Sequence, residues 1–349
     1  MSDKKYKVGV VIPTYNRKSI VEKCVLRLLS FPLEFDITVS DNDSSDGTFE
    51  CLKKIKDPRL NLIKQDFNVG ASYNIHLSYL NSRAKYAILI SDEEDVTIEA
   101  IQYLEAIDNC RPDVSVIFGS GIVLNNKDKR YKDEVFIDYK SALFRLAFQT
   151  RYMSGITFNI DNYKKALSNV SFEQSVKLFD TYSFMVAAAI LMCSGSTITS
   201  NIVFYKQARK AKTSATNNAI REIYYYEPKG RMLQFECWMN CILGLPFDDD
   251  SFKQKLIIKQ LFDNILLSYR VLSKRELELI ADIASDADYQ MFSNHIKDCS
   301  RESILSSFLL FAFSKMKEAG IILSNAKSIE DGVLVDNLDY YKERLNEVK

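Results

Sequence analysis

The chain has 349 residues, 47% hydrophobic and 26% charged, so it can bury one large core or two smaller ones. Its 46 Lys and Arg residues balance its 46 Asp and Glu residues, which leaves no overall field to attract nucleic acid. Seven scattered cysteines without a CxxC pair, and a polar amino terminus in place of a secretory leader, predict free thiols in a reducing cytoplasm.

The first ninety residues alternate apolar, β-branched runs, which predict strands, with apolar residues at helical spacing, which predict helices. The predicted strands cover residues 8–12, 35–39, 60–64 and 86–90. The predicted helices cover residues 19–29, 48–56 and 68–81, and Ser19 is the expected N-cap of the first. Strands that alternate with helices through short connections predict βαβ units and a parallel sheet.

A polar cluster follows three of these predicted strands: Pro13–Arg17, Asp41–Asp46 and Asp92–Asp95. Because ligands of parallel α/β sheets bind beyond the carboxyl ends of the strands, we expect the three clusters to share one cleft. Four consecutive acids after a core strand carry a high desolvation cost unless a cation neutralises them. A divalent Mg²⁺ or Mn²⁺ ion suits such oxygen ligands, and a solvated turn is the alternative interpretation.

The second half of the chain changes character. Further strands are predicted at residues 114–118, 121–124 and 197–205, a charged loop or hairpin at 125–134, a pocket lining at 151–159 and an apolar helix at 179–193. From about residue 215 helical patterns dominate, at residues 231–243, 251–272, 274–284, 302–318 and 337–348. We expect Asp248–Asp250 to cap the second of these helices and to complement its dipole.

Four segments, taken in order, resemble the nucleotide-sugar-binding half of the family 2 glycosyltransferases. They are VGVVIPTYNR (8–17), TVSDNDSSDGT (38–48), FNVGASYNIHL (67–77) and LISDEED (89–95). The resemblance implies the α/β GT-A fold, a Rossmann-like, mostly parallel sheet flanked by helices, here with an α-helical carboxyl-terminal extension. It covers about the first hundred residues, weakens toward residue 213 and does not reach the helical tail. We therefore expect a nucleotide-sugar-binding and catalytic domain at 1–214 and a helical domain at 215–349.

The resemblance implies that the strand ends bind the nucleotide. Asp41 would accept a hydrogen bond from a uracil N–H or a ribose hydroxyl, since an ionised carboxylate can only accept. Tyr15 would offer its ring to the nucleoside, and Arg17 would meet a phosphate. The full set of implied nucleotide-binding residues is Pro13, Thr14, Tyr15, Arg17, Asp41, Asn42, Asn68, Gly70 and Asn74. Relatives often carry Asp-Asp-Gly-Ser where this chain has Asp-Asn-Asp-Ser at 41–44, which leaves the base preference open.

The acids stand in the place of the family's DxD motif. Its carboxylates hold a cation that bridges both phosphates and stabilises the departing diphosphate. Asp92 and Glu94, with Asp95 in support, are the predicted ligands of Mn²⁺ or Mg²⁺, and Glu93 with Asp95 is the other register. Relatives often add a later histidine, but none occurs between residues 78 and 294.

Inverting transfer needs a general base that takes a proton from the acceptor hydroxyl. The resemblance points to Asp180, just before the apolar 184–193 stretch, with Glu173 as second choice and a simple N-cap as the alternative role of Asp180. It also implies an acceptor wall at Ser154–Gly155. The basic residues that either close over the diphosphate or form a solvated linker are Lys206, Arg209, Lys210 and Lys212.

These expectations combine into a metal-dependent, inverting glycosyltransferase that uses a nucleotide sugar, a UDP-sugar above others. Its acceptor would be a glycan or lipid-linked glycan of a bacterial surface polysaccharide, such as capsule or lipopolysaccharide, which rests on analogy alone. Two alternatives stay open: a non-catalytic nucleotide-sugar-binding or scaffold protein of the same fold, and a nucleotidyltransferase, although PTYNRKS lacks the glycines of a phosphate loop.

No apolar run reaches the roughly 20 residues that span a bilayer, so we expect a cytoplasmic protein. A peripheral contact at the inner face of the membrane, and a homo-oligomer formed through the helical tail, are left open by the sequence.

Overall fold

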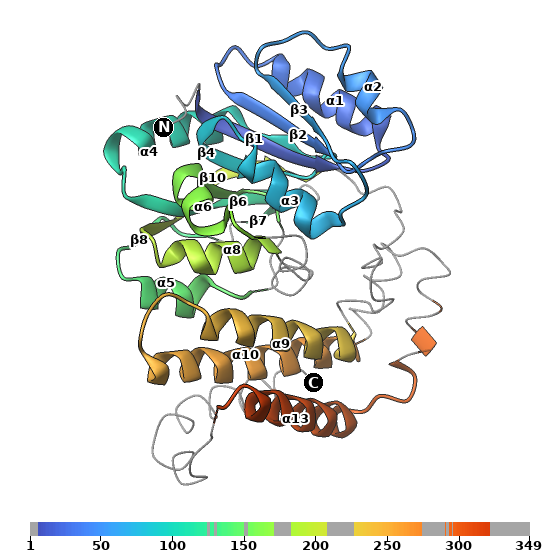
Figure 1. The fold of residues 1–349 in the computed structure, drawn as a ribbon, viewed down its shortest axis with the longest axis vertical. Coiled ribbons are helices and arrows are strands. Elements are labelled where there is room, and N and C mark those ends of the chain that lie inside the picture. Colours follow the sequence, from blue (N-terminus) through green and yellow to red (C-terminus); the bar gives the residue numbers. More distant parts are fainter. Residues whose placement is uncertain are drawn as a thin grey trace. The chain divides into compact units, whose positions relative to one another are not determined.

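The computed structural model describes residues 6–123, 126–128, 131–149, 153–170, 183–207, 227–273, 290, 293, 294 and 296–321. The chain divides into two compact units, residues 1–209 and 210–349, where the sequence placed a boundary after residue 214. Each unit is described separately below, with the element labels of Figure 1.

The amino-terminal unit is built on one mixed sheet. Four parallel strands form the first part: β1 (Tyr6–Thr14), β2 (Asp36–Asp41), β3 (Leu60–Lys64) and β4 (Ala84–Leu89). The other strands are β5 (Asp95–Val96), β6 (Val114–Val123), β7 (Asn126–Asp128), β8 (Glu134–Phe136), β9 (Ile156–Asn159) and β10 (Ser196–Lys206). Among the described residues the order is β3-β2-β1-β4-β9-β6-β10-β5, with β7 beside β6 and β8 beside β10 (Figure 1). β9 is antiparallel to both β4 and β6, and it joins the parallel half to the rest of the sheet.

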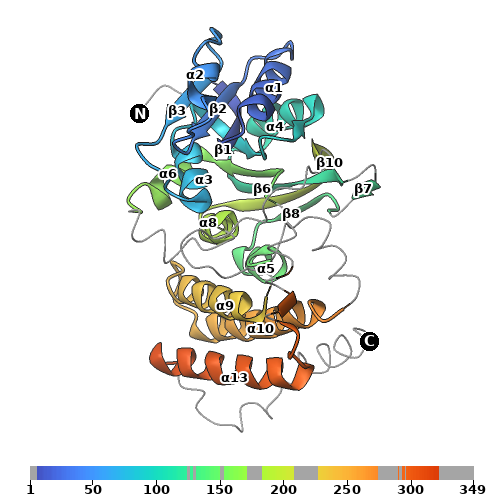
Figure 2. The same cartoon turned by 90° about the vertical axis from the view of Figure 1, so that its right-hand side faces the viewer.

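Helices cover both faces of the sheet (Figure 2). One face carries α1 (Lys18–Leu29), α2 (Thr48–Leu52) and α4 (Ile98–Cys110), and the other carries α3 (Ala71–Leu80), α6 (Ile160–Leu167) and α8 (Ser183–Met192). The apolar stripe of α1 and the strands beneath it, including Val10 and Ile12, form one buried core, which supplies the main hydrophobic driving force. The predicted α/β class, with a mostly parallel sheet flanked by helices, is confirmed.

Three local predictions need correction. Helix α1 begins at Lys18 and its N-cap position is Arg17, so Ser19 is not the cap. The helix predicted at 48–56 ends at Leu52. The two strands predicted at 114–118 and 121–124 form the single strand β6, and α4, β5, β9, α6 and α5 (Tyr139–Leu146) were not predicted.

The apparent break in β6 has a packing reason. A Cβ atom at Gly119 would lie 2.0 Å from Cγ of Phe204, and one at Gly121 would lie 2.2 Å from Cζ of Tyr205. The rings of Phe204 and Tyr205 on the neighbouring strand β10 therefore occupy the space that a side chain at either glycine would need. The sequence predicted two separate strands here, but the glycines make room for a cross-strand contact within one continuous strand.

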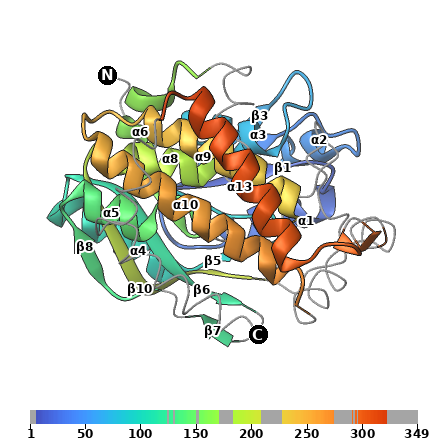
Figure 3. The ribbon, with the colours of Figure 1, turned by 90° about the horizontal axis from the view of Figure 1, so that it is seen from below.

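The carboxyl-terminal unit is helical in its described part, as predicted. It contains α9 (Pro228–Leu243), α10 (Asp250–Arg270) and α13 (Arg301–Glu318), which contact one another, and Figure 3 shows α13 alongside α10. The carboxylate of Asp249 accepts a hydrogen bond from the main-chain N–H of Phe252 at 2.9 Å, which confirms the predicted capping role of the triple Asp. None of the described helices has both the length and the apolar composition to cross a bilayer.

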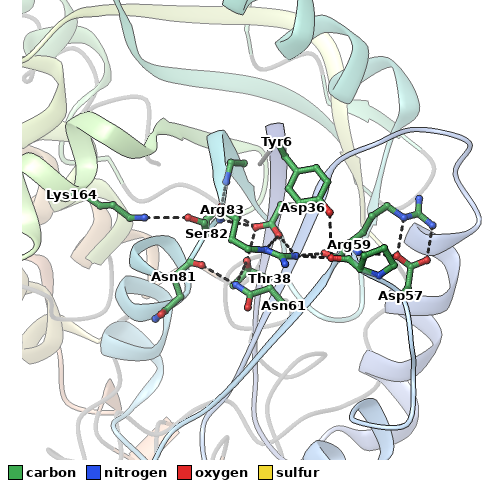
Figure 4. Close-up of polar contacts among 12 residues, drawn as sticks. Tyr6, Asp36, Thr38, Asp57, Arg59, Asn61, Asn81, Ser82, Arg83 and Lys164 are labelled. Carbon is green, nitrogen blue, oxygen red and sulfur yellow. Dashed lines mark hydrogen bonds and ion pairs between the residues drawn. The ribbon is translucent and has the colours of Figure 1, made fainter. Parts of the chain in front are cut away.

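A network of hydrogen bonds closes the amino-terminal end of the parallel strands (Figure 4). The buried carboxylate of Asp36 accepts from Thr38 Oγ1 at 2.7 Å, from Ser82 Oγ at 3.2 Å and from Arg83 Nε at 2.8 Å. The guanidinium of Arg83 also donates to the carbonyl oxygen of Arg59 at 2.8 Å. The polar groups named here are therefore hydrogen-bonded to one another, and they hold the amino-terminal ends of the strands together.

Replacing Arg83 with Ala should destabilise the amino-terminal unit, because it leaves the buried Asp36 carboxylate without its cation. We expect a loss of about 3 kcal/mol in the free energy of unfolding, measured by urea denaturation. The matched control is Lys85→Ala, which breaks the pair with Asp108, an acid whose side chain is 13% exposed whereas that of Asp36 is fully buried. That control should cost about 0–1 kcal/mol. Equal losses in the two variants would contradict the role given to Asp36.

His76 on α3 is a second buried polar group. Its Nδ1 lies 2.9 Å from the hydroxyl oxygen of Tyr163, and its ring stacks on Tyr73 with centroids 5.4 Å apart. Burial lowers the pKa of His76 from 6.5 to about 4. The imidazole is therefore neutral in the folded protein near pH 7.

The low pKa of His76 predicts a loss of stability in mild acid. Between pH 6.5 and about 4 the unfolded chain takes up a proton that folded His76 refuses, so stability falls as the pH drops. The contribution is at most about 1.4 kcal/mol per pH unit. His76→Gln, compared with the unaltered chain by urea denaturation across this range, should remove that part of the slope. Identical slopes in the two proteins would contradict the prediction.

Candidate active site

Hydrogen bonds join the three polar clusters at the carboxyl ends of β1, β2 and β4. Thr14 Oγ1 donates to Asp92 Oδ2 at 2.7 Å, which links the end of β1 to the turn after β4. The main-chain N–H of Asn42 donates to the carbonyl oxygen of Thr14 at 3.0 Å, which links β2 to β1. The main-chain N–H of Asn16 donates to Ser44 Oγ at 2.8 Å. The clusters thus meet at one edge of the sheet, as the parallel arrangement predicted.

The loop after β1 is held by side chains of the loop after β2. Asn16 adopts a left-handed conformation with φ of 51°, and its Oδ1 accepts from the main-chain N–H of Ser45 at 2.8 Å. The carboxylate of Asp46 accepts from the main-chain N–H of Lys18 and of Thr48, both at 3.0 Å, so it caps α1 and α2 together. Asp46 therefore does for α1 what Ser19 was expected to do.

Asp41 ends β2 as a fully buried acid. Its Oδ1 accepts a hydrogen bond from the hydroxyl of Ser44, and its Oδ2 has no hydrogen-bond partner among the described residues. Burial raises the pKa of Asp41 above its ordinary value, while the Ser44 hydroxyl acts in the opposite direction. A buried carboxylate oxygen without a donor is unfavourable, so a ligand that supplies an N–H or O–H there gains free energy.

Asn42 and Asn68 shape the loop before α3. Asn42 Oδ1 accepts from the main-chain N–H of Val69 at 2.9 Å, and its Nδ2 donates to Asn68 Oδ1 at 2.8 Å. Asn68 Oδ1 also accepts from the main-chain N–H of Gly70 at 2.9 Å, where the backbone is left-handed with φ of 79°. The Asn42 amide is thus committed to this loop, which it holds against the end of β2.

The Asn74 amide is also committed to the protein. Its Oδ1 accepts from Ser40 Oγ at 2.6 Å, and its Nδ2 donates to the carbonyl oxygen of Ser40 at 3.0 Å. Because both ends of this buried amide bind β2, Asn74 fastens α3 to the sheet and is not arranged to reach a ligand.

Two aromatic side chains are exposed at the same edge. Tyr15 follows β1 and is 45% exposed, and Phe67 follows β3 and is 55% exposed. β1 and β3 flank β2, so these rings lie in the loops on either side of the strand that ends in Asp41. Exposed rings at a ligand-binding edge suit stacking on a planar base. Phe67 was not singled out from the sequence, where a lone aromatic in a polar loop carries no signal.

The acidic turn after β4 points its side chains in different directions. Asp92 Oδ1 and Glu93 Oε2 each lie 3.1 Å from the same atom, Nη1 of Arg17. Burial raises the pKa of Asp92 above its ordinary value, and the charge of Arg17 and the hydroxyl of Thr14 lower it. Asp92 and Glu93 thus converge on one cation.

Glu94 and Asp95 turn away from this pair. The fully buried carboxylate of Glu94 accepts from the hydroxyl of Ser154, and Asp95 forms an ion pair with Arg27 of α1. Arg27 also donates to the carbonyl oxygen of Glu94 at 3.1 Å. The structure therefore does not bring Asp92, Glu94 and Asp95 together, and the adjacent acid Glu93 is the neighbour of Asp92 instead. The turn, closed by the Glu94 N–H on the carbonyl oxygen of Ser91 at 3.1 Å, overrides the every-second-residue pattern of a strand.

The described part of the chain contains no group of three or more His, Cys, Asp or Glu side chains placed to hold a metal. Asp92 and Glu93 nevertheless already hold a positive charge between them. Mg²⁺ is commonly bound through one or two carboxylates, with substrate phosphates as further ligands. The pair therefore fits a divalent cation that arrives together with a diphosphate.

Several candidates from the sequence lie outside the described residues: Asp180, Glu173, Arg209, Lys210 and Lys212. Lys206 is described and is exposed at the end of β10, where it stands opposite Asp95 in the antiparallel register of β10 and β5. Ser154 is buried, and its hydroxyl donates to the carboxylate of Glu94. Gly155 has φ of 85°, and its N–H donates to the carbonyl oxygen of Leu89 at 2.9 Å. Both residues lie just before β9, where Ser154 holds the acidic turn and Gly155 holds the end of β4.

Part of the chain matches a known protein family. Residues 9–163 match the family described as Glycosyl transferase family 2. The amino-terminal unit carries a family 2 glycosyltransferase domain. The match begins within β1, extends beyond the four segments that suggested it and includes β2, β4, β9 and the acidic turn.

A curated relative with a stated activity is similar to part of the chain. It is UDP-Glc:alpha-D-GlcNAc-diphosphoundecaprenol beta-1,3-glucosyltransferase WfgD of Escherichia coli, 24% identical over 124 residues. The match covers 35% of this chain and 48% of the relative, so it spans about half of that protein's length.

Solved structures of S. aureus TarS share the fold. Residues 1–349 of TarS in complex with UDP superpose with a TM-score of 0.55 at 14% identity, covering 88% of this chain and 87% of that one. A longer TarS chain gives a TM-score of 0.54 at 14% identity, covering 74% of this chain and 43% of that one. At this level of identity the likeness concerns the fold alone, and it agrees with the predicted GT-A fold.

Proposed function

We propose that this protein transfers a sugar from a UDP-linked donor to a hydroxyl group of a bacterial surface glycan, with inversion at the sugar carbon and with a divalent metal. The observation that carries the proposal is the meeting of two buried acids, Asp41 and Asp92, at the carboxyl edge of a family 2 domain. Hydrogen bonds through Thr14, Asn42 and Ser44 tie both acids to the same two loops.

Asp41 supports a uracil-containing donor. Its unpaired Oδ2 can accept one hydrogen bond, and the imide N–H of uracil is a donor of matching kind. Tyr15 and Phe67, exposed on either side of β2, offer faces for the base. Pro13 and Thr14 at the end of β1, and Asn68 and Gly70 before α3, would supply backbone beside it. Both the name of WfgD and the UDP-bound structure of TarS agree with a UDP-sugar.

Asp92 and Glu93 would hold the divalent cation, Mn²⁺ or Mg²⁺. When bound, such an ion neutralises charge on the departing diphosphate. The chain's own contribution is to hold the two carboxylates at the strand end: Thr14 fixes Asp92 from β1, and Ser154 and Arg27 anchor the rest of the turn.

The acceptor is proposed to be a lipid-linked glycan. WfgD is named for a diphosphoundecaprenol acceptor, and a protein that works on such a substrate would operate in the cytoplasm at the inner face of the membrane. Asp180 remains the proposed general base, which would remove the proton from the acceptor hydroxyl as that oxygen attacks the sugar.

The donor is tested by calorimetric titration with UDP in the presence of Mn²⁺. Asp41→Ala should weaken binding by about ten- to hundredfold, because a hydrogen bond to a charged group contributes about 1.5–3 kcal/mol. Asp66→Ala, which removes an exposed acid from the loop after β3, is the control and should bind as the unaltered chain does. Equal affinity in Asp41→Ala and the unaltered chain would refute the assignment of Asp41.

The proposed general base, Asp180, is tested by measuring sugar transfer from a panel of UDP-sugars to a lipid-diphosphate-linked sugar. Asp180→Asn should leave UDP affinity unchanged and reduce transfer by about a hundredfold or more, as expected when a general base is lost. Transfer at the unaltered rate would remove Asp180 from the mechanism. UDP binding by the unaltered chain without transfer to any acceptor would favour a non-catalytic binding protein.

A further inference from the structure

A cation already lies between the two acids that are proposed to bind the metal. Nη1 of Arg17 donates to Asp92 Oδ1 and to Glu93 Oε2, each at 3.1 Å. The exposed fractions of the three side chains are 25% for Arg17, 5% for Asp92 and 15% for Glu93. These ion pairs are largely removed from solvent, so the attraction between their charges is only weakly screened.

The backbone of Arg17 is anchored, whereas its side chain reaches the acids at the end of a long stem. The carbonyl oxygen of Arg17 accepts from the N–H groups of Ile20 and Val21, both at 3.0 Å, in the first turn of α1. On either side of it, Asn16 and Lys18 are held by the loop after β2 through Ser45 and Asp46. Movement of the guanidinium therefore requires rotation of side-chain bonds and no change in the main chain.

We propose that Arg17 is a resident counter-ion that a divalent metal must displace from Asp92 and Glu93. This inference rests on the proposed metal-dependent donor binding. A guanidinium and a dication cannot share the same two carboxylate oxygens, because like charges repel at that distance. Metal alone therefore binds weakly, since it has to break both ion pairs and leaves Arg17 without a partner.

A diphosphate changes that balance. Guanidinium groups bind phosphate oxygens as well as carboxylates, so the displaced Arg17 gains a new partner when UDP is present. Metal and diphosphate then bind cooperatively. The diphosphate gives the displaced Arg17 a new partner, and the metal compensates Asp92 and Glu93 when Arg17 leaves them. Arg17 acts as a positioning residue that couples the two, and it protects the buried acids from repulsion in the ligand-free protein.

The other cations near the turn are not equivalent. Arg27 holds Asp95 and the carbonyl oxygen of Glu94, and these contacts do not compete with the Asp92–Glu93 pair. Lys18 follows Arg17 directly, but within the described structure no contact joins its side chain to Asp92 or Glu93. Lys18→Ala is therefore a matched control that removes the same charge from the neighbouring position.

The experiment measures Mn²⁺ binding from the electron paramagnetic resonance signal of the free ion, with and without UDP. In the absence of UDP, Arg17→Ala should bind Mn²⁺ more tightly than the unaltered chain, by about tenfold or more, because the metal no longer has to break two charge-assisted contacts. In the presence of UDP this advantage should vanish or reverse. The factor by which UDP improves Mn²⁺ binding should therefore be smaller in Arg17→Ala, while Lys18→Ala should keep it.

Equal Mn²⁺ affinity of Arg17→Ala and the unaltered chain without UDP would overturn the inference, and so would an undiminished effect of UDP in Arg17→Ala. In either case UDP-dependent Mn²⁺ binding would leave the proposed function standing. Failure of every variant to bind Mn²⁺, with or without UDP, would overturn both the metal proposal and this inference.

A second pair of variants guards against a folding defect in Arg17→Ala. Arg17→Gln retains hydrogen-bond donors for Asp92 and Glu93 without the charge, and it should show the same gain in Mn²⁺ affinity. Glu93→Gln removes one of the two carboxylates for which Arg17 and the metal compete. In the Glu93→Gln background the effect of Arg17→Gln should shrink, and full additivity of the two changes would contradict the shared position. Thermal unfolding of each variant shows that the fold is retained.

Discussion

The ion pairs between one guanidinium and two carboxylates are the interaction on which the geometry of this site depends. Asp92 is nearly inaccessible to solvent at the end of a core strand, and a buried charge of that kind persists only when it is compensated. Arg17 supplies the compensation from the N-cap position of α1, and Thr14 supplies a hydrogen bond from β1. The turn after β4 is thereby attached to the first two elements of the chain. The same contacts explain why the amino-terminal loop, the first helix and the acids form one site although they are far apart in sequence.

The two acids at the ends of strand β2 have different roles, one in stability and the other in the proposed ligand binding. It begins at Asp36 and ends at Asp41, and both acids are fully buried. Asp36 has donors from Thr38, Ser82 and Arg83, so its charge is fully used in holding the strands together. Asp41 has Ser44 on one oxygen and no hydrogen-bond partner on the other within the described residues. An acid that is saturated stabilises the fold, whereas one that keeps an unsatisfied oxygen at the carboxyl edge provides a place for a ligand donor.

The family match ends within the amino-terminal unit, and the carboxyl-terminal unit consists of helices in its described part. In enzymes built on α/β sheets, the loops at the strand ends carry the catalytic residues, while additional elements vary from one protein to another. Phe308 of α13 packs edge-on against Phe235 of α9 with ring centroids 6.1 Å apart, and both rings are buried, so this unit has apolar packing of its own. The donor chemistry proposed above depends only on residues of the amino-terminal unit.

The sequence by itself determined the alternation of strands and helices, the parallel arrangement of the first four strands and the edge where the polar clusters meet. These features depend on local periodicity and on the direction of the chain, which a sequence carries directly. Only the tertiary structure decided which acids form a pair, because the turn after β4 sends Glu93 toward Arg17 and Glu94 toward Ser154. It likewise decided that the Asn74 amide is used up inside the protein. The direction of a side chain in a turn depends on partners that are distant in sequence, and no periodic pattern encodes them.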